Sequence, residues 1–221
     1  MLENGKEPSY IKKNLAAIRY AHDQLPNPRY RLERSNDKLG VPNRVPPGNR
    51  AWEAYEYELL CETAVVSGKE WIKDILTLQR ELGLRIHEVV RLDTVAVERA
   101  FQNGYLEAKG KGEKERVTIP LTDASKGALR NARARVKRGA KLFVPEGQKA
   151  HKIQNDVQKF IWENRPQRAG EQLTSHGLRY SYAQKRITDL LSEGVSQGNA
   201  EQKVAREMGH ERRRVTRGYL K

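Results

Sequence analysis

The sequence predicts a mainly α-helical protein with a small three-stranded antiparallel sheet, and therefore an α+β fold. Apolar residues recur at spacings of three and four through most of the chain, which is typical of amphipathic helices. Residues 93–120 differ, because they are rich in β-branched residues and contain glycine turns. The 221 residues, 37% of them hydrophobic, are enough for one full domain and a smaller appendage.

A region rich in proline and glycine divides the chain. A helix over Tyr10–Leu25 is predicted from its apolar spacing, and Pro26 ends it. Residues 40–48, with the sequence GVPNRVPPG, are predicted to be a linker. We therefore expect three parts: an N-terminal segment over residues 1–38, a linker over 39–50 and the main domain over 51–221.

Helical periodicity continues in the main domain on both sides of the β-branched region. Before that region, helices are expected around Trp52–Thr63 and Trp71–Leu82. After it, Thr122 is a suitable N-cap for a helix that runs to Gly139. Further helices are expected near residues 149–164, 175–193 and 199–208.

Three strands are expected in the β-branched region, at Asp93–Glu98, Tyr105–Lys109 and Arg116–Pro120. Asn103–Gly104 and Gly110–Gly112 supply turns between them. Successive strands joined by short turns pair antiparallel, so the three segments predict a meander.

The net charge of +14 favours a polyanionic partner, and nucleic acid is the usual one for so basic a domain. Four basic residues have the spacing of one face of the helix after Thr122, namely Arg130, Arg133, Lys137 and Lys141. This stripe is either a solvated basic face or a direct phosphate contact, and the spacing favours neither. The same two interpretations hold for the run Arg212, Arg213 and Arg214.

The composition also bears on the compartment. The single cysteine, Cys61, has no partner for an internal disulfide and lies among apolar residues, so we expect a core side chain in a reducing compartment. No stretch has the length and apolar character of a membrane span. No group of Asp, Glu and His residues has convincing metal-ligand spacing. We expect a cytoplasmic protein without a membrane partner, a metal or a cofactor.

Two short patterns contain residues suited to phosphate chemistry. Arg85 and Glu88 lie three residues apart, so on a helix the carboxylate can hold the guanidinium, although such pairs are common. His176 and Arg179 have the same spacing, at the head of an apolar stripe that is expected to face inward. A buried arginine needs an anionic partner. That partner is either a carboxylate or a substrate phosphate, and this segment alone leaves both open.

A third pattern lies near the end of the sequence, where Met-Gly-His210 is followed by Arg-Gly-Tyr219. The histidine and the tyrosine are nine residues apart, so a continuous helix would separate them by about 13 Å. For both to touch one phosphate, the chain must turn between them. Gly218, beside the tyrosine, would give it the freedom to move.

The combination is more specific than any of its parts. Six residues follow one another in the order and local context of the tyrosine recombinase family, the phage-integrase-like enzymes: Arg85 in GLRIHE, Lys111 in KGKGEKERV, His176 and Arg179 in HGLR, His210 in GH, and Tyr219. The resemblance covers about residues 50–221. It implies the catalytic-domain fold of that family. It also implies a site-specific DNA recombinase, or integrase, that cleaves and rejoins strands through a covalent 3′-phosphotyrosyl intermediate without metal or ATP.

By this resemblance Tyr219 is the nucleophile. A tyrosine with an ordinary pKa near 10 is ionised only to about one part in a thousand at pH 7, so a base has to assist it. His176 is the expected base. A phenolate is a better leaving group than an alkoxide, so a DNA 5′-hydroxyl can reverse the link without an energy cofactor.

The other positions supply charge and protons. Arg85 and Arg179 are expected to hold the non-bridging phosphate oxygens, which match the planar guanidinium fork. Glu88 is expected to support Arg85. Lys111, on a hairpin tip, is expected to protonate the departing 5′ oxygen, and His210 to donate a further hydrogen bond to the phosphate.

The resemblance also implies the partners: double-stranded DNA, a homotetramer on two DNA sites, and a monomer in the absence of DNA. A nucleoid-associated protein of bacterial or phage origin is expected. Residues 1–38 correspond to the remnant or tail of an N-terminal helical core-binding domain, and only Leu220 and Lys221 follow Tyr219. We therefore expect a chain without the full clamp or the exchange helix of the family. Two alternatives remain open, a type IB topoisomerase-like enzyme and a catalytically silent DNA-binding regulator of the same fold.

Overall fold

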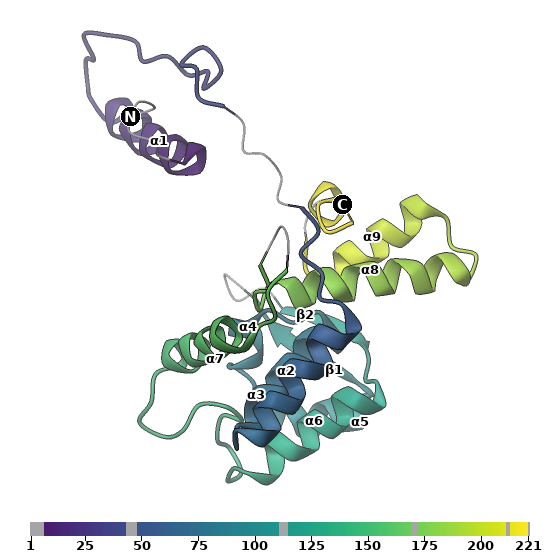
Figure 1. The fold of residues 1–221 in the computed structure, drawn as a ribbon. Coiled ribbons are helices and arrows are strands. Elements are labelled where there is room, and N and C mark those ends of the chain that lie inside the picture. Colours follow the sequence, from purple (N-terminus) through teal and green to yellow (C-terminus); the bar gives the residue numbers. More distant parts are fainter. Residues whose placement is uncertain (1–6, 43–47, 111–114, 169–171, 211–212, 221) are drawn as a thin grey trace. The chain divides into compact units, whose positions relative to one another are not determined.

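The computed structural model describes residues 7–42, 48–110, 115–168, 172–210 and 213–220, except for the side chains of Arg213 and Arg214. The chain divides into two units, Met1–Pro46 and Pro47–Lys221 (Figure 1). Each unit is described by itself.

The first unit contains helix α1 (Pro8–Asp23), which confirms the helix expected near Tyr10–Leu25. Proline in the first turn suits a helix start, because its missing N–H would have no partner there. The segment after the helix is tied back to it. Arg19 donates hydrogen bonds to the carbonyl of Glu33 at 3.0 Å and to the side chain of Asn36 at 2.9 Å.

The second unit is mostly helical around one two-stranded sheet. Its helices before and beside the sheet are α2 (Ala54–Val66), α3 (Glu70–Leu82), α4 (Ile86–Val89) and α5 (Thr94–Asn103). The strands are β1 (Tyr105–Lys109) and β2 (Glu115–Pro120). After the sheet come α6 (Asp123–Ala134), α7 (Ala150–Asn164), α8 (Gly177–Ser192), α9 (Gln197–Glu207) and α10 (Arg213–Arg217). The helices expected near 149–164, 175–193 and 199–208 are confirmed.

The expectation of three strands is wrong in one segment. Within the described part of the chain the sheet has two strands, β1 and β2, which pair antiparallel, and Asp93 forms only an isolated antiparallel bridge with Lys141. Residues 93–98 instead begin α5, because Asp93 is the N-cap and its side chain accepts the backbone N–H of Ala96 at 2.9 Å. The helix ends at Gly104, whose φ of 77° is in the left-handed region. The capping bond and the packing of Val97 and Ala100 in the core outweigh the weak β preference of the local sequence.

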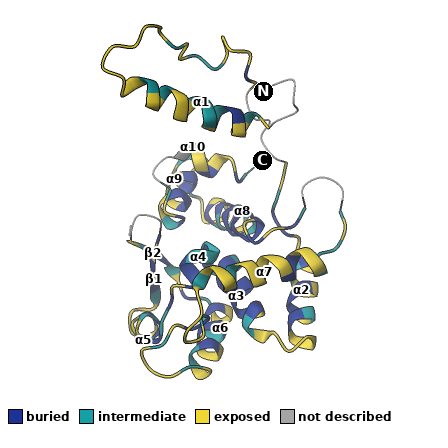
Figure 2. Ribbon diagram, turned by 90° about the vertical axis from the view of Figure 1, so that its left-hand side faces the viewer, coloured by how far each residue is buried: buried dark blue, intermediate teal, exposed yellow. Residues whose placement is uncertain are grey.

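Helix α3 lies at the centre of the second unit and is buried along most of its length (Figure 2). It packs against α2, α6 and α8. The main core fills the space between these elements, and it includes Leu60, Ile75, Leu129 and the predicted core residue Cys61. Within the described residues, no helix has the length and apolar character needed to span a membrane.

A second, smaller core lies between α8, α9 and the C-terminal segment. It contains Tyr180 and Tyr182 from α8, Val204 from α9, Met208 after it, and Tyr219. Tyr219, the nucleophile expected from the family resemblance, is therefore part of a packed cluster, with 8% of its surface exposed. Tertiary packing brings the C-terminal segment onto α8.

Gly83, the C-cap of α3, has a φ of 59° and lies against the ring of Tyr182. We predict that Gly83→Ala lowers the free energy of unfolding by about 2–4 kcal/mol, because left-handed strain adds to a steric clash. An added Cβ would lie 2.5 Å from a ring carbon of Tyr182. Urea unfolding followed by circular dichroism measures the loss.

Gly68→Ala is the matched control, since Gly68 has a φ of 67° and no atom within 4 Å of an added Cβ. It should lose only about 1 kcal/mol, from backbone strain. Equal losses in the two variants would show that the approach of Tyr182 to Gly83 does not constrain this junction.

Candidate active site

The turn between α3 and α4 positions the first arginine. Arg85 is the N-cap of α4, and its backbone N–H donates to the Glu88 carboxylate at 2.7 Å. Its guanidinium donates to the same carboxylate at 3.0 Å. The two residues thus form the ion pair that their spacing indicates, and the pair also caps the helix. The side chain of Arg85 remains 29% exposed, so it is accessible to solvent.

A second arginine at this carboxylate escaped the sequence analysis. Arg116, on β2, donates to Glu88 at 2.8 Å and to the carbonyl of Gly83 at 3.1 Å. It also donates to the carbonyl of Glu207, and its side chain is only 7% exposed. Strand alternation was the available signal, because Arg116 shares a face with the buried Thr118.

The third arginine, Arg179, lies on α8 and is completely buried. It donates to the carbonyls of Gly83 and Met208, the latter at 3.0 Å, and lies 3.9 Å from the Glu88 carboxylate. The sequence left open which anion accompanies this arginine. In the structure its nearest carboxylate is one that two other arginines already contact.

The electrostatics of the cluster are unbalanced, since three guanidinium groups surround one carboxylate. Burial raises the pKa of Glu88, but the hydrogen bond and the charge of Arg116 outweigh it, so that the pKa falls to about 2. Burial and the charge of Arg85 lower the pKa of Arg179 to about 10, which leaves it protonated at pH 7. The three arginines therefore keep a net positive charge of two beside the carboxylate.

The tyrosine and a histidine meet at the edge of this cluster. The hydroxyl of Tyr219 lies 3.0 Å from Nε2 of His176, the residue that precedes α8. Burial, followed by the charges of Arg179 and Arg85, lowers the pKa of His176 to about 4. His176 is therefore neutral at pH 7, and Nε2 can accept a proton.

Aromatic rings surround the phenol of Tyr219. The ring of Tyr180 packs against it with centroids 4.3 Å apart, and the ring of His210 lies at 5.2 Å. The sequence analysis assigned no function to Tyr180, and no local pattern distinguishes it. Gln184 donates to the carbonyl of Tyr219 at 2.9 Å, which anchors the backbone as well.

The chain turns between His210 and Tyr219, as the sequence analysis requires. Gly209, with a φ of 66°, follows the C-cap of α9, and α10 packs against α9. Nε2 of His210 lies 3.3 Å from a guanidinium nitrogen of Arg179, and Nδ1 lies 3.0 Å from the hydroxyl of Thr216. Burial and the charge of Arg179 lower the pKa of His210 to about 3.

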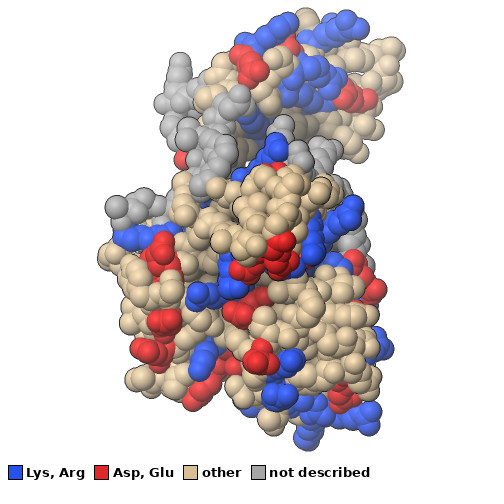
Figure 3. All heavy atoms as spheres, turned by 90° about the vertical axis from the view of Figure 1, so that its right-hand side faces the viewer, with Lys and Arg blue, Asp and Glu red and all other residues tan. Residues whose placement is uncertain are grey.

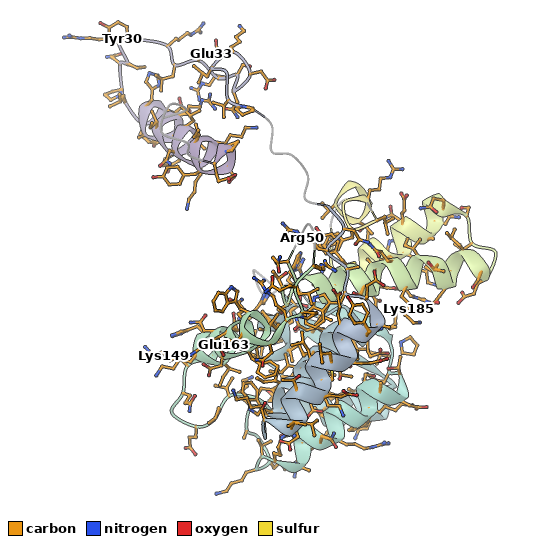
Figure 4. The ribbon with its side chains drawn as sticks, in the orientation of Figure 1. Tyr30, Glu33, Arg50, Lys149, Glu163 and Lys185 are labelled. Atoms are coloured by element: carbon orange, nitrogen blue, oxygen red, sulfur yellow. The ribbon has the colours of Figure 1, made fainter. Side chains whose placement is uncertain are left out.

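A close backbone approach fixes the start of α8. A Cβ on Gly177 would clash with the carbonyl oxygen of Arg50, a residue labelled in Figure 4. Trp52 donates from its indole to the carbonyl of Thr174 at 3.0 Å and from its backbone to Ser181 at 2.8 Å. The segment before α2 is thus fastened across the start of α8, where His176 lies.

A cavity of about 450 Å³ adjoins the cluster. Arg85 and His176 line one part of it, and Trp162 and Arg165, from the end of α7, line another. The partly exposed side chain of Arg85 is therefore accessible from this cavity. Within the described residues, no group of three or more His, Cys, Asp or Glu side chains is arranged to hold a metal ion.

Some residues named from the sequence lie elsewhere or outside the described part. Lys111 and Arg212 lie outside the described residues, and only the backbone of Arg213 and Arg214 is described, in α10.

The expectation that the helix after Thr122 runs to Gly139 is wrong, and the basic stripe therefore does not lie on one helix. Helix α6 is capped by Thr122 as expected but ends at Ala134, so the stripe is split between this helix and the loop after it.

The four side chains of that stripe have different surroundings. Arg130 lies over the ring of Phe101 at 5.5 Å. Arg133 pairs with Glu98 at 3.3 Å, and Lys141 pairs with Asp93 at 3.2 Å. Lys137 follows the helix end. Arg133 and Lys141 therefore have carboxylate partners within the protein.

Glu88 provides a test of the cluster that needs no substrate. A carboxylate with a lowered pKa stabilises the fold above its unfolded pKa of 4.5, and that contribution disappears as the pH falls toward about 2. We predict that Glu88→Gln costs roughly 3 kcal/mol at pH 7 and that the difference from wild type shrinks between pH 5 and pH 2. Urea unfolding across this pH range measures the difference in the free energy of unfolding.

Glu58→Gln, at an exposed position on α2, is the control for this prediction. A pH-independent difference for Glu88→Gln would contradict the ion-pair account.

Comparison with known proteins identifies the family to which this fold belongs. The model of the phage integrase family matches residues 52–221. Comparison with curated protein sequences gives no significant match. Among solved structures, XerA recombinase aligns with a TM-score of 0.58 and 19% identity, over 82% of this chain and 62% of that one.

Two DNA complexes have similar folds. A lambda integrase tetramer bound to a Holliday junction aligns with a TM-score of 0.59 and 18% identity, over 82% of this chain and 50% of that one. The Tn1549 transposon integrase with circular intermediate DNA aligns with a TM-score of 0.62 and 16% identity, over 100% of this chain and 77% of that one. The chain thus spans about half to two thirds of the first two structures. The fold, and a family model that covers most of the sequence, show that the chain belongs to the phage integrase family of tyrosine recombinases.

Proposed function

We propose that this chain carries the catalytic part of a site-specific DNA recombinase, which cleaves and rejoins DNA through a covalent 3′-phosphotyrosyl bond to Tyr219. One observation carries the proposal. The phenol of Tyr219 lies 3.0 Å from the neutral imidazole of His176, beside three arginines that share one carboxylate. A nucleophile, a proton acceptor and unbalanced positive charge therefore occur together.

The positive charge suits a phosphodiester. Its single negative charge, which spreads further over the oxygens in the transition state, offsets one of the two positive charges that Glu88 leaves unbalanced. Arg85 offers its exposed part to a non-bridging oxygen, whereas Arg179 supplies fixed charge from within the core. Charges held in place by the fold stabilise a transition state without reorganising, and each typically contributes a factor of about 10²–10³ in rate. We propose that they fill the role that metal ions have in many other phosphoryl-transfer enzymes.

The proton follows a short route. His176 takes the phenolic proton as the oxygen of Tyr219 attacks phosphorus. The bond from phosphorus to the 5′ oxygen breaks, and Lys111 is proposed to protonate that oxygen, by resemblance to the family. The arriving phosphate raises the pKa of His176, because a nearby negative charge favours the imidazolium. In the reverse step a 5′-hydroxyl attacks the phosphotyrosyl bond, so one phosphodiester replaces another and no nucleotide cofactor is consumed.

Double-stranded DNA is the proposed substrate, in keeping with the DNA complexes of the similar integrases. We propose a tetramer on two sites, by analogy with the lambda integrase tetramer on a Holliday junction.

Residues 1–38 are proposed to be the tail of a core-binding domain, and residues 39–50 are proposed to be a linker. The proposed compartment is the cytoplasm of a bacterium, including one infected by a phage. Basic and acidic side chains intermix on the face shown in Figure 3. The arginine cluster around Glu88 is the proposed principal phosphate contact. The weaker candidates for backbone contact are Arg130, Arg133, Lys137, Lys141, Arg212, Arg213 and Arg214.

The covalent bond can be trapped on a nicked duplex that carries the core site, once that site is selected from random-sequence DNA. Wild-type protein should form an adduct that resists SDS, and Tyr219→Phe should bind the duplex but form none. Tyr180→Phe is the matched control, because it removes a hydroxyl from the ring that packs on Tyr219 and should still form the adduct. An adduct with Tyr219→Phe would assign the nucleophile elsewhere. Relaxation of supercoiled DNA without exchange between two sites would favour the topoisomerase alternative.

The role of Lys111 has a chemical test. Lys111→Ala should cleave an ordinary duplex at least about a hundredfold more slowly, since general-acid catalysis typically contributes 10²–10⁴-fold. A duplex with sulfur at the 5′ leaving position should restore cleavage, because a thiolate leaves without a proton. Lys109→Ala, which removes an exposed lysine from the same hairpin, is the control and should need no rescue. Equal impairment of Lys111→Ala on both duplexes would show that this lysine is not the acid.

A further inference from the structure

His210 lies between two partners of different chemistry. Its Nε2 is 3.3 Å from a guanidinium nitrogen of Arg179, and its Nδ1 is 3.0 Å from the hydroxyl of Thr216. A guanidinium only donates, so Nε2 must accept. The ring proton is therefore on Nδ1, and the Thr216 hydroxyl accepts it. Thr216 is completely buried, and its hydroxyl is the partner that fixes this tautomer.

This tautomer conflicts with the role that the family resemblance gives to His210. A histidine that donates to a phosphate from Nε2 needs a proton on that atom, yet in the structure Nε2 uses its lone pair to accept from Arg179. If the hydrogen bond from Nδ1 to Thr216 persists, Nε2 can become a donor only when the ring gains a second proton. The ring then carries a positive charge.

The surroundings oppose that second proton in the empty site. His210 faces Arg179 from α8, Arg85 from the start of α4, Arg116 from β2 and the neutral His176, and the phenol of Tyr219 packs on its ring. These positive charges and burial disfavour the imidazolium. A phosphate anion among the arginines would offset that charge and would also compete with His210 for the guanidinium of Arg179.

We propose that Thr216 is a positioning residue that holds His210 with its proton on Nδ1, and that His210 gains a proton on Nε2 only when a phosphate group occupies the site. His210 thereby becomes a donor to the phosphate with the substrate in place and remains an acceptor without it. The inference rests on the proposed function only in its assumption that a phosphate enters the arginine cluster.

Thr216 also connects this histidine to the nucleophile. Its carbonyl accepts the backbone N–H of Tyr219 at 2.9 Å, while its hydroxyl binds His210. One residue of α10 thus holds both the histidine and the tyrosine segment. A change in the Thr216 side chain affects the histidine directly and leaves the backbone bond to Tyr219 in place.

The tautomer is measurable without DNA, by NMR of protein labelled with ¹⁵N-histidine. The chain has five histidines, and His210→Gln identifies the signals of His210. In the free wild-type protein at pH 7 we expect a neutral ring with the proton on Nδ1. Titration with inorganic phosphate should convert it to a ring with protons on both nitrogens. Thr216→Ser should behave like wild type, and Thr216→Val should lose the fixed Nδ1–H form.

A proton on Nε2 in the free protein, or a ring that stays neutral when phosphate saturates the site, would overturn the inference. This result stands whether or not the protein cleaves DNA, so it is separate from the test of the Tyr219 adduct. Thr188→Val is the matched control, since Thr188 on α8 is exposed and its hydroxyl bonds to the backbone carbonyl of Gln184. It should leave the His210 signals unchanged.

Cleavage kinetics provide a second readout. Thr216→Val should cleave the nicked duplex about tenfold to a hundredfold more slowly near pH 7, since a hydrogen bond to a charged group is lost. Because the lost bond stabilises the imidazolium, the alkaline limb of the pH–rate profile should also move to lower pH, by about one unit. Thr216→Ser should stay within about threefold of wild type. A uniform loss of rate at every pH would indicate a purely structural role and would contradict the proposal.

Discussion

The carboxylate of Glu88 is the point on which the arrangement of the site depends. It binds Arg85 at 3.0 Å and Arg116 at 2.8 Å, and Arg179 lies 3.9 Å away. These arginines come from the start of α4, from β2 and from α8, so a single acidic group ties together three elements that are distant in sequence. A buried charge without partners is costly, which makes the contacts mutually dependent. The same group balances only one of the three positive charges, and the excess is what the proposed function assigns to a phosphate group.

Backbone carbonyls accept further hydrogen bonds from the buried arginines of the cluster. The carbonyl of Gly83 accepts from both Arg116 and Arg179, and the carbonyl of Met208 accepts from Arg179. These oxygens lie at the ends of α3 and α9, where helical carbonyls have no partner within the helix. Helix ends therefore accept hydrogen bonds from the terminal nitrogens of both buried guanidinium groups, whereas the Nε atoms of Arg116 and Arg179 are buried without a hydrogen-bond partner. Glycine at position 83 permits both the left-handed turn and the approach of Tyr182.

The sequence predicted most helices, because an apolar face repeats with the period of the helix wherever a helix packs on the core. It failed at residues 93–98, where β-branched residues outweighed the capping signal of Asp93. It also extended the helix after Thr122 too far, because the spacing of basic residues continues beyond the last helical residue, Ala134. Charge spacing alone does not hold a helix together, and Arg133 and Lys141 bind separate carboxylates.

The residues of the candidate site also form two groups, those that the sequence indicated and those that only the fold brings to the site. Arg85 with Glu88 and His176 with Arg179 were noticed as pairs spaced by one turn, and the family resemblance gave them their expected roles. Arg116, Tyr180 and Thr216 were not noticed, since their contacts depend on tertiary packing: Arg116 meets Glu88 across 28 residues, and Tyr180 meets Tyr219 across 39. Thr216 lies only six residues from His210, yet the contact requires the turn at Gly209. No spacing rule indicates such contacts before the fold is known.

The most direct measurement is peptide mapping of the trapped protein–DNA adduct by mass spectrometry, after nucleases have trimmed the DNA. The account predicts a residual nucleotide joined through its 3′-phosphate to Tyr219. A nucleotide on any other residue, or one joined through a 5′-phosphate, would contradict it.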